Sequence, residues 1–152
     1  MVVLSFVSSE RILVPPPMTV DSIMSRDVVT VAPDTALMDI RRLLHKEGFH
    51  HLLVVEADNT LSGVISDRDV LRALSPFLDT YSEEHRDVKT LSQPASEIMR
   101  RDPLTVAPDT STEEAAQILL DNNISSLPVV EENALVGIVT TKDLLEYYSN
   151  AT

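Results

Sequence analysis

The pattern of apolar and polar positions over residues 28–47 predicts a short strand followed by an amphipathic helix. Residues 28–31 form an apolar, β-branched run that Pro33 stops, which is typical of a strand. Asp34 and Thr35 then supply a helix start. The helix is predicted by apolar side chains that recur every three or four residues: Leu37, Ile40, Leu43 and Leu44. We expect it to end near Glu47, because Gly48 follows.

Two further apolar runs, residues 52–55 and 61–65, complete the unit. The short segment 56–59 separates them, and this arrangement predicts a β-hairpin. A helix over residues 67–74 closes the unit. The order is therefore strand, helix, strand, strand, helix, an α+β arrangement that is too small to be stable alone.

The same pattern returns in the second half of the chain. Residues 23–35, IMSRDVVTVAPDT, recur as residues 98–110, IMRRDPLTVAPDT, so the second copy follows the first by 75 residues (24 to 99). The second copy is one residue shorter after Asp58, where a turn is expected. Thr110 and Glu113 have the spacing of a helix capping box. Two copies cannot form a long solenoid, so we expect them to pack face to face with pseudo-twofold symmetry.

Changes in composition divide the chain into four segments. Residues 1–17 differ from the rest and end in three prolines, which favours an extended N-terminal extension. Residues 18–74 are the first repeat and residues 94–149 the second. Residues 75–93 are polar and charged without a helical pattern, so they are expected to connect the repeats.

Charge and composition narrow the possible functions. The chain has 24 acidic and 12 basic residues, and its net charge of −12 repels nucleic acids. Aromatic residues make up only 4 %, with no tryptophan, which argues against a base-stacking platform. The absence of cysteine removes disulfides, thiolate metal sites and cysteine nucleophiles. No apolar run approaches a membrane span, so we expect a cytoplasmic protein without membrane contact.

The most informative stretch is the junction between the last strand and the last helix of each copy. It reads GVISDRD over residues 63–69 and GIVTTKD over residues 137–143. A strand that runs into a helix leaves unpaired amide donors where an anion can bind. An aspartate in the first helical turn can accept hydrogen bonds from two sugar hydroxyls. Gly63 and Gly137 leave space for a ligand to approach. Each copy therefore has the features of a nucleoside-phosphate site.

The same spacing also has an interpretation that needs no ligand. Ser66 with Asp69, and Thr140 with Asp143, fit a helix N-cap and its partner three residues on. The two interpretations are compatible, because a capping hydroxyl also lies beside the exposed amides. The residues at the second helical position favour phosphate, since a cation there opposes the helix dipole unless an anion is bound: Arg68 and Lys142.

Catalytic and metal sites have little support in the sequence. His45 and His50 are five residues apart rather than four, and no acidic residue completes a ligand set. Asp67 and Asp69 diverge on a helix, so they do not form a catalytic carboxylate pair. Ser66 has no histidine or lysine spaced to activate it. We therefore predict no enzyme activity, no metal and no required cofactor.

These motifs together resemble the tandem cystathionine-beta-synthase (CBS) domain pair, or Bateman module. The matching features are the Ile-Met openings, the two TVAPDT runs, the LPVV of residues 127–130 and the two Gly-to-Asp stretches. The likeness covers residues 19–74 and 94–148, so we expect a stand-alone pair. The sequence is also similar to bacterial acetoin-utilisation regulatory proteins of this type.

The resemblance implies two clefts that bind adenine nucleotides (AMP, ADP or ATP) or another adenosyl ligand such as S-adenosylmethionine or NAD. The ribose would be held by two carboxylates, Asp69 and Asp143. The phosphate would lie near hydroxyl and basic residues: Ser66, Arg68, His50, His51, Thr140 and Lys142. The base pocket would be lined by the first strand segment of each copy: Val28, Val29, Thr30, Pro103, Leu104 and Thr105.

The two clefts are expected to be unequal. His50 and His51 precede the central strand of the first copy, whereas the second copy has Ser125 and Ser126 there. We therefore expect the phosphate at the first copy, although solvated imidazoles are the alternative for the histidines.

The predicted function is a regulatory module that senses an adenosyl ligand and acts on a protein partner that the sequence does not identify. Homodimerisation through exposed helix faces is expected, as in similar pairs. The alternative is a dimerisation or scaffold domain without a ligand, in which the two motifs only cap helices.

Overall fold

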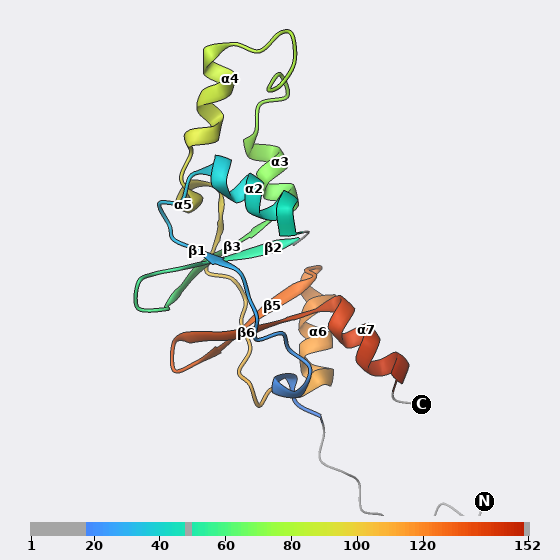
Figure 1. The fold of residues 1–152 in the computed structure, drawn as a ribbon. Helices are drawn as coiled ribbons and strands as arrows, with labels where there is room; N and C mark the ends of the chain where they lie inside the picture. The colour runs from blue at the N-terminus through green and yellow to red at the C-terminus, as the bar shows by residue number, and fades with distance from the viewer. Residues whose placement is uncertain (1–17, 48–49, 151–152) are drawn as a thin grey trace, which may run out of the picture.

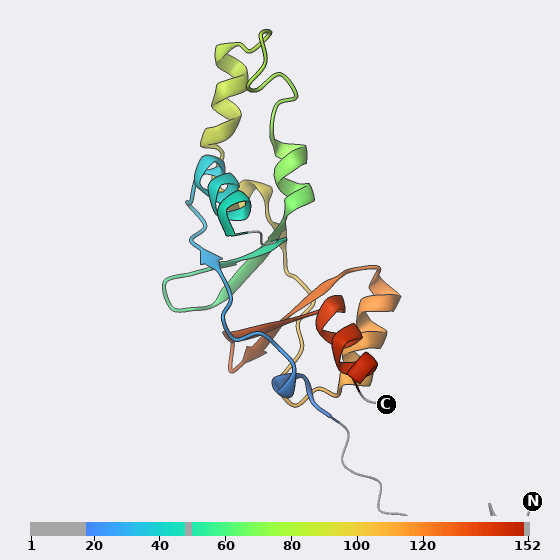
Figure 2. The ribbon, with the colours of Figure 1, turned by 45° about the vertical axis from the view of Figure 1, so that its right-hand side comes forward.

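The structure is a computed structural model that describes residues 18–47 and 50–150. The expected N-terminal extension, residues 1–17, and the helix stop at Gly48 lie outside the described residues. Figures 1 and 2 show two sheets near the middle of the molecule, with the helices of each half on the side away from the other half. None of the helices in the described part of the chain is long and apolar enough to cross a membrane.

The first repeat has the predicted α+β order. Its elements are β1 (Thr30–Val31), α2 (Leu37–Glu47), β2 (His51–Val55), β3 (Leu61–Ser66) and α3 (Asp67–Ala73). Strand β2 pairs in parallel with β1 and antiparallel with β3, which confirms the predicted hairpin. Strand β1 is shorter than predicted, but Val29 O still accepts a hydrogen bond from Leu53 N at 3.2 Å. The segment before β1 therefore remains attached to the sheet.

The second repeat has the same order. Its elements are α6 (Thr112–Asn122), β5 (Ser126–Glu131), β6 (Ala134–Thr140) and α7 (Thr141–Asn150). Strands β5 and β6 form an antiparallel hairpin. The counterpart of β1 is a single parallel bridge, in which Val106 O accepts from Val130 N at 2.9 Å. The α+β class and the two repeats are confirmed.

The predicted starts of the first helix in each repeat are wrong by one or two residues. Thr110 does not cap α6; its Oγ1 accepts from Ala107 N at 3.1 Å and so closes a turn before the helix. The cap is Ser111, whose Oγ accepts from Glu114 N at 3.1 Å. The chain has hydroxyl and glutamate residues at the same spacing in two adjacent registers, and the turn takes the first hydroxyl.

The connection between the repeats contains a helix that the sequence pattern did not predict. This segment holds α4 (His85–Lys89) and η2 (Thr90–Ser92), and it projects beyond α2 and α3 (Figure 1). A buried carboxylate organises it: Asp87 accepts hydrogen bonds from Glu84 N at 2.7 Å and from Ser75 Oγ at 2.6 Å. Local capping rather than apolar periodicity stabilises α4, which explains why the pattern missed it.

Each repeat is completed by a segment from the other half of the chain. Met24 and η1 (Val20–Ser22) pack into the core of the second repeat, beside Leu127 and Val139. In return, Met99 and the short helix α5 (Ala95–Ile98) pack into the core of the first repeat. We call these two stretches, residues 20–25 and 95–101, the crossed segments.

Backbone pairing ties each crossed segment to the strand it covers. Strand β4 (Arg100–Arg101) pairs antiparallel with β3. On the other side, Ser25 and Ile138 exchange two backbone hydrogen bonds, both 2.9 Å long. The repeats also meet at their hairpins, where a small cluster of Leu53, Val64 and Leu135 is buried between them.

The two motif glycines lie directly under the methionines of the crossed segments. A Cβ atom added at Gly63 would lie 2.6 Å from Met99 Sδ, and one added at Gly137 would lie 2.7 Å from Met24 Sδ. We expected this space to admit a ligand, and that expectation is wrong. The flexible methionine side chain of the other half fills it.

Candidate functional site

Both junction motifs fold as capped helix starts. Ser66 Oγ accepts a hydrogen bond from Asp69 N at 3.2 Å, and Asp69 Oδ2 accepts from Ser66 N and Oγ at 2.8 and 3.0 Å. Thr140 and Asp143 repeat this arrangement with the same three distances. Each motif aspartate therefore uses Oδ2 to cap its helix, and Oδ1 is left for other partners.

The surroundings of the two Oδ1 atoms differ. Asp69 Oδ1 lies 3.4 Å from Arg100 Nε and 3.7 Å from Arg72 Nη1, and the Asp69 side chain is only 8 % exposed. For Asp143 Oδ1, no hydrogen-bond or ion-pair partner is found within residues 18–47 and 50–150. Asp143 is partly exposed. Of the two carboxylates, Asp143 is the one that can accept hydrogen bonds from a ligand without losing an existing partner.

Asp143 lies in a cleft between the two repeats. The cleft has a volume of about 180 Å³ and is lined by residues from both halves: Ser25, Asp27, Val28, Val29, His50, His51, Leu53, Ile138, Thr140 and Asp143. We call it the Asp143 cleft. One wall is apolar, formed by Val28, Val29 and the side chains of Leu53 and Ile138 from the two sheets. A mainly apolar wall with a few polar groups is typical of a site for a small organic ligand.

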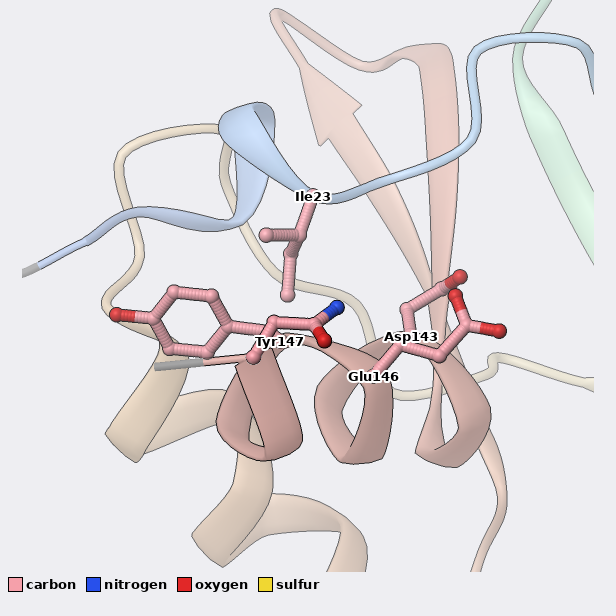
Figure 3. A pocket seen from close by; sticks show the side chains of 5 residues that line it. Ile23, Asp143, Glu146 and Tyr147 are labelled. Atoms are coloured by element: carbon pink, nitrogen blue, oxygen red, sulfur yellow. The ribbon is translucent and has the colours of Figure 1, made fainter. Parts of the chain in front are cut away.

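A second hollow adjoins the first at Asp143. It has a volume of about 350 Å³ and is lined by Ile23, Asp143, Glu146, Tyr147 and Asn150. Figure 3 shows Asp143, Glu146 and Tyr147 along one side of α7, with Ile23 of the crossed segment opposite them. Because Asp143 lines both hollows, a ligand held by this carboxylate can extend into either of them.

The histidines lie at the polar side of the Asp143 cleft. His50 Nδ1 is 3.4 Å from Asp67 Oδ2, and its side chain is largely exposed. His51 Nε2 is 3.3 Å from Ser125 Oγ of the second repeat. Burial lowers the pKa of His51 below its usual value of 6.5, and the negative charge of Asp67 opposes that shift. His51 is therefore neutral at pH 7 in the absence of a ligand.

The structure brings six of the predicted site residues together, but it groups them differently from the sequence. Val28, Val29, His50 and His51 of the first repeat share one cleft with Thr140 and Asp143 of the second. The sequence predicts the histidines at the phosphate of the first copy, whose motif carboxylate is Asp69. That grouping is wrong, because the repeats face each other and the strand segment and histidines of the first copy lie opposite the motif of the second.

The other predicted residues lie elsewhere. Ser66 and Asp69 line neither hollow. Arg68 and Lys142 are exposed, and Lys142 Nζ lies 3.9 Å from Glu146 Oε1. The remaining predicted residues line neither hollow: Thr30, Pro103, Leu104 and Thr105. Sequence reasoning missed Ser25, Asp27, Leu53 and Ile138, although their positions beside predicted site residues were a usable signal.

A family model described as the CBS domain matches residues 20–76 and again residues 95–150. The chain belongs to the CBS domain family. The resemblance inferred from the two Gly-to-Asp stretches is thus confirmed. A CBS domain-containing protein of Dictyostelium discoideum is 35 % identical over 129 residues, which are 84 % of this chain and 88 % of that protein.

Solved structures of CBS pairs superpose on this chain. AcuB of Vibrio cholerae, described as an acetoin utilization protein, has a TM-score of 0.75 at 28 % identity, and the match covers 89 % of this chain and 93 % of AcuB. CBSX2 in complex with AMP has a TM-score of 0.73 at 29 % identity, and the match covers 87 % of this chain and 96 % of CBSX2. The CBS pair of protein MJ0100, in complex with 5′-methylthioadenosine and S-adenosylmethionine, has a TM-score of 0.74 at 25 % identity. That match covers 90 % of this chain and 100 % of the MJ0100 pair.

Several curated relatives of this CBS pair are longer proteins. An inosine-5′-monophosphate dehydrogenase of Korarchaeum cryptofilum is 34 % identical over 125 residues, which are 82 % of this chain but 23 % of that enzyme. In such relatives the chain spans between about a quarter and half of the length. The CBS pair therefore occurs both in proteins of similar length and as one part of larger ones.

Proposed function

We propose that this CBS pair binds an adenosine-containing ligand in the Asp143 cleft and signals its presence to a partner protein. The observation that carries the proposal is the available Oδ1 of Asp143 in a cleft lined by five other predicted site residues. The complexes of CBSX2 with AMP and of MJ0100 with adenosyl ligands support it, because both proteins share the fold.

The cleft suits each part of such a ligand. The Oδ1 atom of Asp143 can accept hydrogen bonds from the ribose hydroxyls. The apolar wall of Val28, Val29, Leu53 and Ile138 can cover the base. A group attached at the 5′ position would lie near Thr140 at the start of α7, a helix of 10 residues, and near the histidines.

Occupancy of the cleft would change the packing between the repeats. Residues of both repeats line it, and Leu53 and Ile138 also belong to the apolar cluster that joins the two sheets. A ligand that contacts both repeats stabilises the arrangement in which those contacts are made, and that shift in population is what a partner protein would detect. No catalytic step is needed for this role.

A thermal-shift screen tests the proposal. A ligand present at about 100 times its dissociation constant should add about 2.7 kcal/mol to the free energy of unfolding. For a protein of this size that corresponds to a rise in Tm of about 5–10 °C. The panel is AMP, ADP, ATP, NAD, S-adenosylmethionine and 5′-methylthioadenosine. If all six leave Tm unchanged, the chain is not a sensor of this ligand class.

The affinity for AMP should depend on pH through His51. A phosphate beside His51 favours the imidazolium that burial disfavours, so binding should take up a proton. Affinity should therefore rise as the pH falls from about 8 to 6.5, by at most about tenfold per pH unit. Without ligand the sign is opposite: the lowered pKa means that stability present above pH 6.5 is lost as the pH falls below it.

Calorimetric titrations at several pH values measure this dependence. His51→Gln should remove it for AMP, and 5′-methylthioadenosine, which has no phosphate, should show no such slope with the unchanged protein. The charged groups around His51 that act on its pKa are Asp67, His50, Arg100 and Asp69. An AMP affinity that is equally pH-dependent in His51→Gln would show that His51 is not the group that takes up the proton.

The alternative function is a dimerisation or scaffold domain without a ligand. The helix caps at Ser66 and Thr140 favour it, because they account for both motifs structurally.

An apolar face is also available for dimerisation: Leu71 on α3 and Leu145 on α7, which occupy equivalent positions, are 71 % and 65 % exposed. We propose that these helices form a homodimer under either function, and sedimentation velocity measures it. Ligand-induced stabilisation in the screen separates the two functions.

A further inference from the structure

The internal repeat gives the residues around Asp143 counterparts in the aligned positions of the other copy, and two of these counterparts lie against Asp69. Asp143 corresponds to Asp69 in the alignment of the two motifs. Ser25, which lines the Asp143 cleft, corresponds to Arg100 in the aligned Ile-Met openings. Glu146, three residues after Asp143, corresponds to Arg72, three residues after Asp69. Beside Asp143, these two positions are therefore neutral (Ser25) and acidic (Glu146). Beside Asp69, both positions are basic.

We propose that Arg100 closes the counterpart site, so that the chain binds one adenosyl ligand, at Asp143, rather than two. The guanidinium groups of Arg100 and Arg72 lie against Asp69 Oδ1, the atom that would otherwise accept a hydrogen bond from a ribose hydroxyl. The inference rests on the proposed function, and it makes Arg100 the residue that determines how many ligands bind.

The contacts of Asp69 support this closure. Its Oδ2 is used in the helix cap by Ser66 N and Oγ, and its Oδ1 faces two guanidinium groups. A ribose hydroxyl would have to displace a charged partner from a carboxylate that is almost fully buried. Both guanidinium groups would have to move before a hydroxyl could reach Oδ1, and the carboxylate would then lose the positive charges that compensate its burial.

Arg100 is also held in place by its backbone. It lies in β4, where it pairs with Val64 of β3, the strand that leads into the Ser66 cap. Its backbone oxygen is packed so close to Gly63 that a Cβ added there would lie 2.8 Å from it. The same position in the other crossed segment is Ser25, which pairs with Ile138 in the same way but has a neutral side chain that cannot form an ion pair with Asp143.

Exchanging the two residues tests the inference. Isothermal titration calorimetry with AMP, and in parallel with S-adenosylmethionine, measures the number of sites per chain. The unchanged protein should bind one. Arg100→Ser, alone or with Arg72→Glu to reproduce the surroundings of Asp143, should bind two. Ser25→Arg should lower the affinity of the original site at least tenfold. Arg101→Ser, a neighbouring arginine that contacts Ser96 O instead, is the matched control and should keep one site.

The outcomes distinguish this inference from the proposed function. One site in the unchanged protein and still one in both Arg100→Ser variants would overturn the inference and leave the proposed function intact. Two sites in the unchanged protein, with one lost in Arg100→Ser, would overturn it too, because Arg100 would then be a ligand contact. No binding by the unchanged protein would contradict the proposed function. In that case, binding at one site in Arg100→Ser would support closure by Arg100. No binding in Arg100→Ser would overturn the inference.

Discussion

Gly137→Ala should lower the free energy of unfolding by about 3 kcal/mol, at the upper end of the usual cost of overpacking a core. The added Cβ would lie 2.7 Å from Met24 Sδ and 2.9 Å from Ser25 O. Met24 can turn away, but the backbone oxygen of Ser25 cannot, because it accepts a hydrogen bond from Ile138 N while Ser25 N donates to Ile138 O. The expected fall in Tm is about 6–12 °C in thermal unfolding followed by circular dichroism.

Gly63→Ala is the matched variant in the other repeat. Its Cβ would lie 2.6 Å from Met99 Sδ and 2.8 Å from Arg100 O, so the loss should be at least as large. Replacing a glycine also stiffens the unfolded chain, which stabilises by about 0.4–1 kcal/mol where the new residue fits. If both variants melt at or above the Tm of the unchanged protein, the methionines do not pack on the glycines as described.

Asp143→Asn should weaken AMP binding about 10- to 100-fold. The change keeps a carbonyl oxygen that can accept from Thr140 N, so the helix start is retained, but it removes the charge that strengthens hydrogen bonds from the ribose. A hydrogen bond to a charged group is worth about 1.5–3 kcal/mol, which corresponds to this range of affinity. Calorimetry gives the dissociation constant directly.

Asp69→Asn is the control for this variant. It alters the same helix cap in the other repeat, but Asp69 lies outside the Asp143 cleft. Its effect on AMP binding should therefore stay within about twofold, whatever its effect on Tm. A large loss of affinity in Asp69→Asn, with little in Asp143→Asn, would place the ligand at the other motif.

The fold was largely predictable because its signals are local and occur twice. The helical spacing of Leu37, Ile40 and Leu44 and the two apolar runs of the hairpin predicted their elements correctly. Helix α4 was not predictable in this way, because it depends on the bonds that Asp87 makes to Ser75 and Glu84 rather than on an apolar face. The role of the glycines depended on residues more than 30 positions away, which local pattern cannot indicate.

The candidate site was predictable as a set of residues but not as an arrangement. The motif identified Thr140 and Asp143, and the resemblance identified Val28, Val29 and the histidines. Sequence spacing cannot show that a strand segment of one copy lies opposite the motif of the other. It also cannot show that Arg100, rather than solvent, lies against Asp69. Both facts arise from packing between the repeats.

The crossed segments set the order in which a nascent chain can complete its two cores. The first repeat lacks Ala95 and Met99 until residues well beyond α3 have left the ribosome. Val20 and Met24 are synthesised first, but the residues that they pack against follow about a hundred residues later: Leu127, Gly137 and Val139. Contacts between such distant residues slow folding. A translation stop or a proteolytic cut between residues 75 and 93 would therefore leave both halves with an open apolar surface, so the chain should be made and degraded as one unit.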